Sequence, residues 1–428
     1  MKKQQYDQLG ETLYYETLDN GLKVYVLPRH ENNKTFAIFT TDYGSIDDHF
    51  SPLGQKEAIR VPDGIAHFLE HKLFEDEDGD VFDTFSKRGA QTNAFTSFTR
   101  TAYLFSSTSD VHNNVETLID FVQKPYFTEE SVEKEQGIIE QEIRMYDDDA
   151  DWRLFFGLIA SLYKNNTVRV DIAGTVSSIH EITKDMLYTC YETFYHPSNM
   201  VLFVTGPVDP EEMGALVRDN QAAKSFKDVE EISRVYGDEP DESNQKEDVL
   251  HMNVQTPKVL LGYKEGGDAY PLDGLTYELA VQMLLDVMFG SGSQAYEKLY
   301  REGLIDGSFS TDFTMERSFG FSAIGGDSKD PDRLVEVLRD TIRTYKQKVL
   351  NEEEIEVAKK RKIGSFLKQL NSSEFIATQF TRYEMNGDAL FDVVPKLEKL
   401  TIGDLEKVLQ RHFAEDHSSV MKVLPHSS

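Results

Sequence analysis

Alternating apolar and polar positions mark the first ordered stretch of the chain. Residues 21–29 (GLKVYVLPR) and 35–45 (TFAIFTTDYGS) are rich in β-branched and aromatic side chains, and the polar residues 30–34 separate them. Such alternation between polar breaks is typical of strands. The pattern predicts an antiparallel strand pair here, and a second pair at residues 91–99 and 101–109.

The apolar spacing changes after Gly64. From this point apolar side chains recur in the i, i+3, i+4 rhythm of a helix, at Ile65, Phe68, Leu69, Leu73 and Phe74. Further along, helices are predicted at Asn114–Val122 and from residue 129 through 157, followed by a short strand at residues 200–206. Strands and helices in this mixed order predict an α+β fold.

The same order begins again after a polar segment. Residues 227–248 carry nine acidic side chains together with Gly237 and Pro240, a composition that favours a linker. After this segment the pattern predicts a strand at 258–263, a helix at 275–289, strands at 307–314 and 320–326, and a helix from about residue 352. We therefore expect two similar α+β halves, residues 1–226 and 249–428, each a mixed or antiparallel sheet with helices on one face.

Charge narrows the choice of partners. The chain has 75 acidic and 45 basic residues, a net charge of −30, which repels phosphate backbones and anionic lipids. No nucleic-acid partner is expected; the charge serves solubility or attracts basic peptides. No apolar run is long enough for a membrane span, the first twenty residues do not resemble a secretory signal, and the single cysteine, Cys190, suits a reducing compartment. A cytoplasmic location is expected.

The strongest chemical signal is the segment His67-Phe68-Leu69-Glu70-His71. Residues three and four apart share one face of a helix, so both imidazoles and the carboxylate project together. Two neutral imidazoles suit zinc, and a neighbouring carboxylate can act as the general base toward zinc-activated water. The order H-x-x-E-H is a known catalytic signature, and Glu70 is the predicted catalytic residue. The alternative is a helix face that carries these residues by chance.

A third ligand has to come from elsewhere in the chain. The predicted helix at residues 133–145 offers Glu135 and Glu142, which lie seven residues apart and hence on one face, whereas Glu140 lies off that face. A glutamate on an acidic helix is ordinarily a solvated surface residue. The assignment of Glu135 and Glu142 to a metal site therefore depends on the H-x-x-E-H motif upstream.

With these residues the chain resembles the pitrilysin/insulinase-type zinc metallopeptidases. The similarity includes the segment Gly89–Phe105 with its Asn-Ala-Phe-Thr, the E-x6-E spacing of Glu135 and Glu142, and the segments Asp151–Phe156 and Tyr195–Gly206. The resemblance implies two halves that face each other as a clamshell and one Zn²⁺ per chain, held by the first half. It also implies that His67, His71 and Glu142 are the ligands and that Glu135 supports them.

The resemblance further implies that a peptide substrate adds as a strand beside Asn93, Ala94, Phe95 and Thr96. An edge strand offers unpaired backbone groups to any extended peptide, which agrees with this expectation. Without the resemblance, Asn93 is equally well an ordinary residue at a strand end.

One part of the family pattern is missing. Active relatives carry R-x6-Y in the second half, where the two side chains help to bind substrate and stabilise the oxyanion. Alignment on Gly303-Leu304 puts Leu299 and Asp306 at these positions, with Tyr300 and Arg301 as neighbouring alternatives. A carboxylate cannot donate a hydrogen bond to an oxyanion. We therefore expect a dimer, preferably a heterodimer with a related subunit that supplies the arginine and tyrosine.

Three functions remain open at this point. The chain is a zinc endopeptidase that hydrolyses unfolded peptides, a catalytically weak partner subunit of the same fold, or a module that binds peptides without cleaving them.

Overall fold

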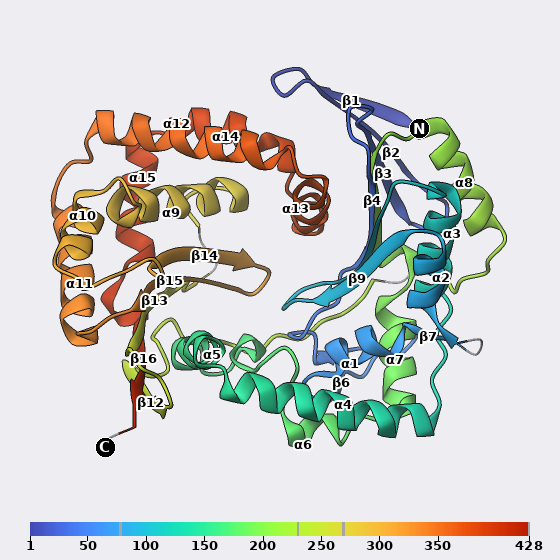
Figure 1. Cartoon of the computed structure of the whole chain (residues 1–428), viewed down its shortest axis with the longest axis horizontal. Helices are drawn as coiled ribbons and strands as arrows, with labels where there is room; N and C mark the ends of the chain where they lie inside the picture. Colours follow the sequence, from blue (N-terminus) through green and yellow to red (C-terminus); the bar gives the residue numbers. More distant parts are fainter. Residues whose placement is uncertain (77–78, 229–230, 268–269, 427–428) are drawn as a thin grey trace. The chain divides into compact units, whose positions relative to one another are not determined.

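The computed structural model describes residues 1–76, 79–228, 231–267 and 270–426, and it divides into two compact units (Figure 1). Unit 1 contains Met1–Ile143, Asp171–Val235 and Gln369–Phe391. Unit 2 contains Arg144–Val170, Tyr236–Lys368 and Asp392–Ser428. Each unit has one main sheet and several helices, which confirms the predicted α+β class.

The main sheet of unit 1 has seven strands in the order β1-β2-β3-β11-β4-β10-β9. The central strands β4 and β11 are buried along their whole length, as their continuous apolar sequences require. Strand β9 lies at one edge of the sheet (Figure 1). The strands are β1 (Lys2–Tyr6), β2 (Glu11–Thr17), β3 (Lys23–Pro28), β4 (Thr35–Thr41), β9 (Ala90–Thr96), β10 (Thr101–Ser107) and β11 (Met200–Gly206).

The predicted pairing of the first two apolar stretches is wrong. Strand β11 lies between β3 and β4, parallel to β3 and antiparallel to β4. The apolar segment at 200–206 needs a fully buried position, and only the centre of the sheet provides one. The second predicted pair is confirmed: β9 and β10 are antiparallel neighbours, with Thr96 opposite Thr101.

Helices and short strands complete unit 1. The helices are α1 (Ile65–Lys72), α2 (Val81–Lys87), α3 (Val111–Val122), α4 (Glu129–Asp148, whose last turn belongs to unit 2), α6 (Val176–Ile179), α7 (Lys184–Phe194), α8 (Pro210–Ala222) and α13 (Ser373–Met385). Two small ribbons pair β5 (His49–Phe50) with β6 (Ile59–Arg60) and β7 (Glu75–Asp76) with β8 (Gly79–Asp80). Single 3₁₀ turns lie at Pro197–Asn199 and Leu390–Asp392.

Unit 2 repeats the strand arrangement of unit 1. Its five-stranded sheet has the order β12-β16-β13-β15-β14, in which β12 and β16 are parallel and the other neighbours antiparallel. This matches β3-β11-β4-β10-β9 in both chain order and direction, so the predicted similarity of the two halves is confirmed. The strands are β12 (Glu247–Met252), β13 (Lys258–Lys264), β14 (Ser310–Glu316), β15 (Phe319–Asp327) and β16 (Ser418–Pro425).

The helices of unit 2 include the strongly apolar α9, which is buried along most of its length. They are α5 (Ala150–Leu162), α9 (Gly274–Phe289), α10 (Gln294–Arg301), α11 (Pro331–Gln347), α12 (Glu352–Gln369), α14 (Val393–Lys399) and α15 (Ile402–His412), with 3₁₀ turns at Thr167–Arg169 and Glu415–His417. Within the described part of the chain, no helix is long and apolar enough to cross a membrane.

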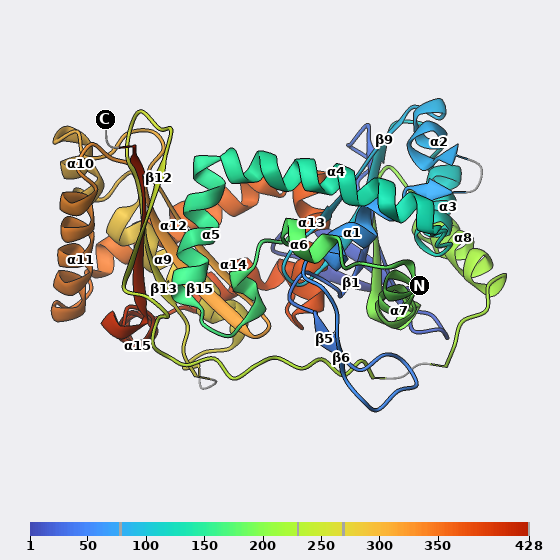
Figure 2. The same cartoon turned by 90° about the horizontal axis from the view of Figure 1, so that it is seen from below.

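Two helices pack in the unit formed mainly by the other half of the sequence: α5, from the first half, belongs to unit 2, and α13, from the second half, belongs to unit 1. Helix α5 packs on β13 and β16 of unit 2 (Figure 2), and α13 packs on β4 and β11 of unit 1. The predicted helix through 129–157 is accordingly broken at Asp149. The backbone of Asp149 is extended, and its carboxylate accepts from the N–H groups of Asp151 and Trp152 as the N-cap of α5.

Candidate metal centre

The start of α1 is set by a close approach of two loops. Gly64 precedes the helix with a left-handed backbone (φ 88°). A Cβ on Gly64 would meet the carbonyl oxygen of Ala173 at 2.4 Å, and one on Gly174 would meet that of Asp63 at 2.5 Å. Only glycine fits at both contacts. The motif helix therefore begins at a fixed point against the 171–174 loop.

The end of α1 is tied to the start of α4 by a buried lysine. Lys72 is fully buried, and its ammonium donates to Glu75 at 2.5 Å and to the carbonyl oxygen of Ser131 at 3.2 Å. An unpaired buried ammonium would be costly, so both contacts have to be kept. Since Ser131 lies in the first turn of α4, Lys72 fixes α1 relative to α4.

Two imidazoles from α1 and one carboxylate from α4 converge. Ligand atoms of His67, His71 and Glu142 all lie within 4.8 Å of one another. The Nε2 atoms of His67 and His71 are 3.8 and 3.7 Å from the two carboxylate oxygens of Glu142. These are the three residues that the sequence predicted as ligands, brought together from two separate helices.

Glu135 orients one of the two imidazoles. Its carboxylate lies 2.9 Å from Nδ1 of His71 and is 8% exposed. A carboxylate accepts, so Nδ1 carries the proton and Nε2 presents its lone pair to the cluster. Metal-ligating histidines are commonly held by such a contact.

The surroundings shift the pKa values of the two histidines in opposite directions. Burial lowers the pKa of His67 to about 3, with the charge of His71 acting in the same direction, so His67 is neutral near pH 7. Burial also acts to lower the pKa of His71, but the hydrogen bond that its Nδ1–H donates to Glu135 and the charges of three nearby carboxylates raise it. Burial acts to raise the pKa of Glu135, but His71 and the neighbouring lysines lower it.

The donor set fits zinc. Two nitrogens and one oxygen are the ligands of many catalytic zinc sites, in which a fourth position is left for water or substrate. In a tetrahedral site with bonds of about 2.0–2.2 Å, ligand atoms lie roughly 3.3–3.5 Å apart. The observed separations of 3.7 and 3.8 Å exceed this by a few tenths of an ångström, which small side-chain rotations can close.

Glu70 lies beside this cluster but outside it. The carboxylate is 8% exposed and accepts a hydrogen bond of 2.6 Å from the Thr96 hydroxyl. Burial raises the pKa of Glu70, and the charge of Glu142 adds to this, while Thr96 and His71 oppose the shift. A carboxyl group with a raised pKa beside a metal site has the properties of a general base that later returns its proton.

A pocket of about 680 Å³ opens next to Glu70. It is lined by residues of α1, α2, α4 and β9 and of the segment between α1 and α2, among them Glu70, His71, Phe74, Phe82, Asn93 and Ala94. The Asn93 side chain accepts from the Ala94 N–H at 2.9 Å. Since this N–H is bonded to a side chain instead of β10, it faces away from the sheet. Phe95, on the face of the strand opposite to Ala94 and Thr96, lies 5.8 Å from the Arg100 guanidinium.

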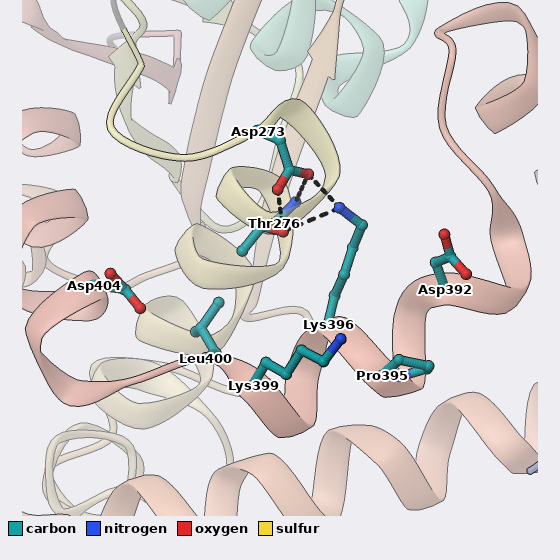
Figure 3. Close-up of a pocket in the computed structure, with 8 residues that line it drawn as sticks. All are labelled: Asp273, Thr276, Asp392, Pro395, Lys396, Lys399, Leu400 and Asp404. Atoms are coloured by element: carbon teal, nitrogen blue, oxygen red, sulfur yellow. Dashed lines mark hydrogen bonds and ion pairs between the residues drawn. The ribbon is translucent and has the colours of Figure 1, made fainter.

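A second pocket, of about 470 Å³, lies in unit 2 (Figure 3). Two of its acidic residues have structural partners: Asp273 caps α9 and pairs with Lys396, and Asp404 forms a capping box with Thr401 at the start of α15. These contacts stabilise helix ends. Among the described residues, the one group of potential metal ligands is the cluster in unit 1.

Comparison with known proteins agrees with the site. Residues 58–176 match the family described as Insulinase (Peptidase family M16), and residues 181–362 match the Peptidase M16 inactive domain. An uncharacterized zinc protease of Bacillus subtilis, YmfH, is 57% identical over 429 residues, with all of both chains covered. The chain belongs to peptidase family M16.

Other M16 proteins share its length and fold. Zinc protease PqqE of Helicobacter pylori is 24% identical over 96% of this chain and 92% of its own. The crystal structure of a putative M16-like peptidase from Alicyclobacillus acidocaldarius is 40% identical, covers 97% of this chain and 98% of its own, and has a TM-score of 0.94. The resemblance inferred from the motifs is thus confirmed.

Neither aligned position in the second half of this M16 chain carries the arginine or tyrosine of the family pattern. Leu299 is fully buried inside α10. The Asp306 carboxylate accepts from the N–H and hydroxyl of Ser308 at 2.8 and 2.6 Å, and these bonds lower its pKa. Of the alternatives, Tyr300 is 59% exposed, and Arg301 pairs with Glu297 one turn away.

Some contacts of the M16 site could not be anticipated. Thr96 is predicted only as part of the peptide-binding strand. In the structure its hydroxyl also contacts Glu70. Nothing in the sequence marked Lys72, whose stem and ammonium are fully buried. Glu140, placed off the ligand face by its spacing, contacts His180 at 2.9 Å.

Proposed function

We propose that this chain is the zinc-bearing subunit of an endopeptidase that hydrolyses unfolded peptides. The observation that carries the proposal is the convergence of His67, His71 and Glu142 beside the buried carboxylate of Glu70, at a pocket bounded by an edge strand. One zinc ion per chain fits this donor set. When bound, zinc supplies a Lewis acid that activates water and polarises a carbonyl group.

The protein residues have separate roles in this proposal. His67, His71 and Glu142 hold the ion, and Glu135 keeps His71 in the tautomer that can do so. Glu70 takes a proton from the attacking water and later gives it to the leaving amine. The outward N–H of Ala94, in the Asn93–Thr96 segment, exchanges its bond to the Asn93 side chain for one to the backbone of an extended peptide. Such backbone pairing selects extended peptides with little regard to sequence.

The proposal includes the organisation of the chain. Residues 1–226 form the zinc-bearing half and residues 249–428 a related half without the metal site, joined by the acidic segment 227–248. A cytoplasmic location stays a prediction, based on the single buried cysteine, Cys190.

A second subunit is part of the proposal, because Leu299 and Asp306 cannot stabilise an oxyanion. Loss of one oxyanion donor costs about 100- to 1,000-fold in rate. We infer that a related subunit with R-x6-Y supplies these donors. The test is turnover of a quenched peptide by the purified zinc-loaded chain, alone and with a related M16 protein from the same organism. Full activity alone, unchanged by the second protein, would exclude the divided site.

The alternative function is a partner or peptide-binding subunit without activity of its own. The match of residues 181–362 to the M16 inactive domain and the burial of Leu299 favour it. Stoichiometric zinc with turnover supports the peptidase. Saturable binding of a fluorescent peptide without cleavage under any subunit combination supports the alternative.

A further inference from the structure

A single hydroxyl links the edge strand to the carboxylate of Glu70. Thr96, the last residue of β9, donates from its Oγ1 to Oε2 of Glu70 at 2.6 Å. Hydrogen bonds from a hydroxyl to a carboxylate at such short distances are charge-assisted and stronger than neutral ones. Because Glu70 is only 8% exposed, water has little access to compete for this oxygen.

The surroundings of Thr96 direct its proton to Glu70. Thr101 lies opposite Thr96 in the β9–β10 ladder. Its hydroxyl donates to the carbonyl oxygen of Tyr43 at 2.9 Å and lies 3.4 Å from Oγ1 of Thr96. The proton of Thr101 therefore has a better acceptor than Thr96. An ionised carboxylate can only accept, so the short contact requires Thr96 to be the donor.

A general base needs this kind of restraint. The terminal torsion of a glutamate side chain has a broad energy profile, so the torsion alone does not fix the direction of the two oxygens. A catalytic group has to be held within about 0.5 Å of its productive position, and a displacement of about 1 Å can cost roughly 100-fold in rate. With Oε2 held by Thr96, Oε1 is the oxygen that takes the proton.

We propose that Thr96 is the positioning residue of Glu70, and that its hydroxyl ties the general base to the strand on which the peptide docks. The inference rests on the proposed peptidase function. Ala94, whose outward N–H donates to the Asn93 side chain and would exchange that bond for one to a docked peptide, lies two residues before Thr96 on the same strand. The base and the bound peptide thus share one rigid element, and docking along β9 places the scissile bond relative to Glu70.

The test compares three substitutions on β9. Thr96→Val removes the hydroxyl and keeps the shape, and Thr96→Ser restores a hydroxyl. Thr92→Val is the matched control, because the Thr92 hydroxyl on the same strand donates to the carbonyl oxygen of Leu104 at 2.8 Å and makes no contact with Glu70. Each variant is loaded with zinc and measured for zinc content, kcat and KM on a quenched peptide, with the second subunit present.

We expect Thr96→Val to lower kcat about 10- to 100-fold, because misorientation of the base affects only the chemical step. Its KM and zinc content stay at the wild-type values, since the backbone of β9 and the three ligands are unchanged. Thr96→Ser recovers most of the loss, and Thr92→Val shows none. An unchanged kcat in Thr96→Val, or a rise of KM that accounts for the whole effect, would overturn the proposal.

A structural measurement decides the question without turnover. In crystal structures of the zinc-loaded proteins, the wild type and Thr92→Val show one orientation of the Glu70 carboxylate, and Thr96→Val shows a rotated or divided one. An identical single orientation in Thr96→Val refutes the positioning role. If the wild type binds zinc but cleaves no peptide with any subunit, the proposed function fails, and the crystal comparison still gives the answer for Thr96.

Discussion

Replacement of Glu135 by glutamine measures how much the cluster depends on the orientation of His71. The wild-type contact of 2.9 Å joins a carboxylate that is 8% exposed to a ring that is 27% exposed, so solvent screens it weakly. Glutamine keeps the size of the side chain but removes the charge that holds the proton on Nδ1. Partners of this kind contribute about 10- to 100-fold to metal affinity. We expect Glu135→Gln to weaken zinc binding by this factor, roughly 1.4–2.7 kcal/mol, and to leave the stoichiometry at one.

The assay is a competition titration of the purified protein against a chromophoric zinc chelator. Helix α4 contains a matched control, because Glu140 contacts His180 at the same distance of 2.9 Å and lies outside the metal cluster. Glu140→Gln therefore removes an equivalent glutamate–histidine pair from the same helix. The reasoning is refuted if Glu135→Gln binds zinc like the wild type, or if Glu140→Gln weakens zinc by as much.

Three further outcomes follow from the site. Glu142→Gln and His71→Ala lose stoichiometric zinc in a metal analysis of dialysed protein, since each removes one of three ligands; full retention by either contradicts the ligand set. Glu70→Gln keeps its zinc but loses turnover, and parallel loss of zinc would instead make Glu70 a ligand. Zinc affinity falls as the pH is lowered through the raised pKa of His71, because below it a proton occupies the ring that must be neutral to bind zinc. The hydrogen bond to Glu135 is the main cause that raises the pKa of His71, so in Glu135→Gln the zinc affinity begins to fall at a lower pH. An unchanged pH dependence of zinc affinity in this variant contradicts the assignment.

The parts of the structure that the sequence predicted are those fixed by local spacing. The motif helix is predictable because the apolar residues around it have helical periodicity, and residues 67, 70 and 71 then share one face of the helix. The same holds for Glu135 and Glu142, two turns apart on α4. The hairpin of β9 and β10 was also readable, since its two strands are joined by a short turn.

The parts that it missed depend on contacts between distant segments. Strand β11 lies between β3 and β4, although more than 150 residues of the sequence separate it from β4. No local sequence pattern predicts which strands flank a buried strand. Helices α5 and α13 each pack on the sheet of the other half of the chain, although the linear order groups them with their own half. The contact of Thr96 with Glu70 likewise joins a strand end to a helix face. Such choices are set by the total burial of the fold and not by local propensity.

In the second half, the helix that corresponds to α1 in chain order carries other polar residues in place of the potential metal ligands. Helix α9 lies in the connection from β13 to β14, as α1 lies in the connection from β4 to β9. Helix α9 carries Glu278 and Gln282, which lie four residues apart, as the two histidines do on α1. The Lys362 ammonium, on α12, donates to Gln282 at 2.7 Å, and the Gln282 amide donates to Glu278 at 3.0 Å.

Unit 2 therefore places a lysine ammonium beside its polar pair, whereas unit 1 brings together three potential metal ligands. Burial lowers the pKa of Lys362, and Asp286, Glu278 and Asp312 oppose this shift by their charge. A buried carboxylate needs a positive partner, whether a metal ion or an ammonium group. In the described residues only unit 1 has a metal-type cluster, because there two histidines and a glutamate converge without a lysine among them. The repeat thus keeps one framework and places the metal-type cluster in one half alone, which is the asymmetry that the proposed divided active site requires.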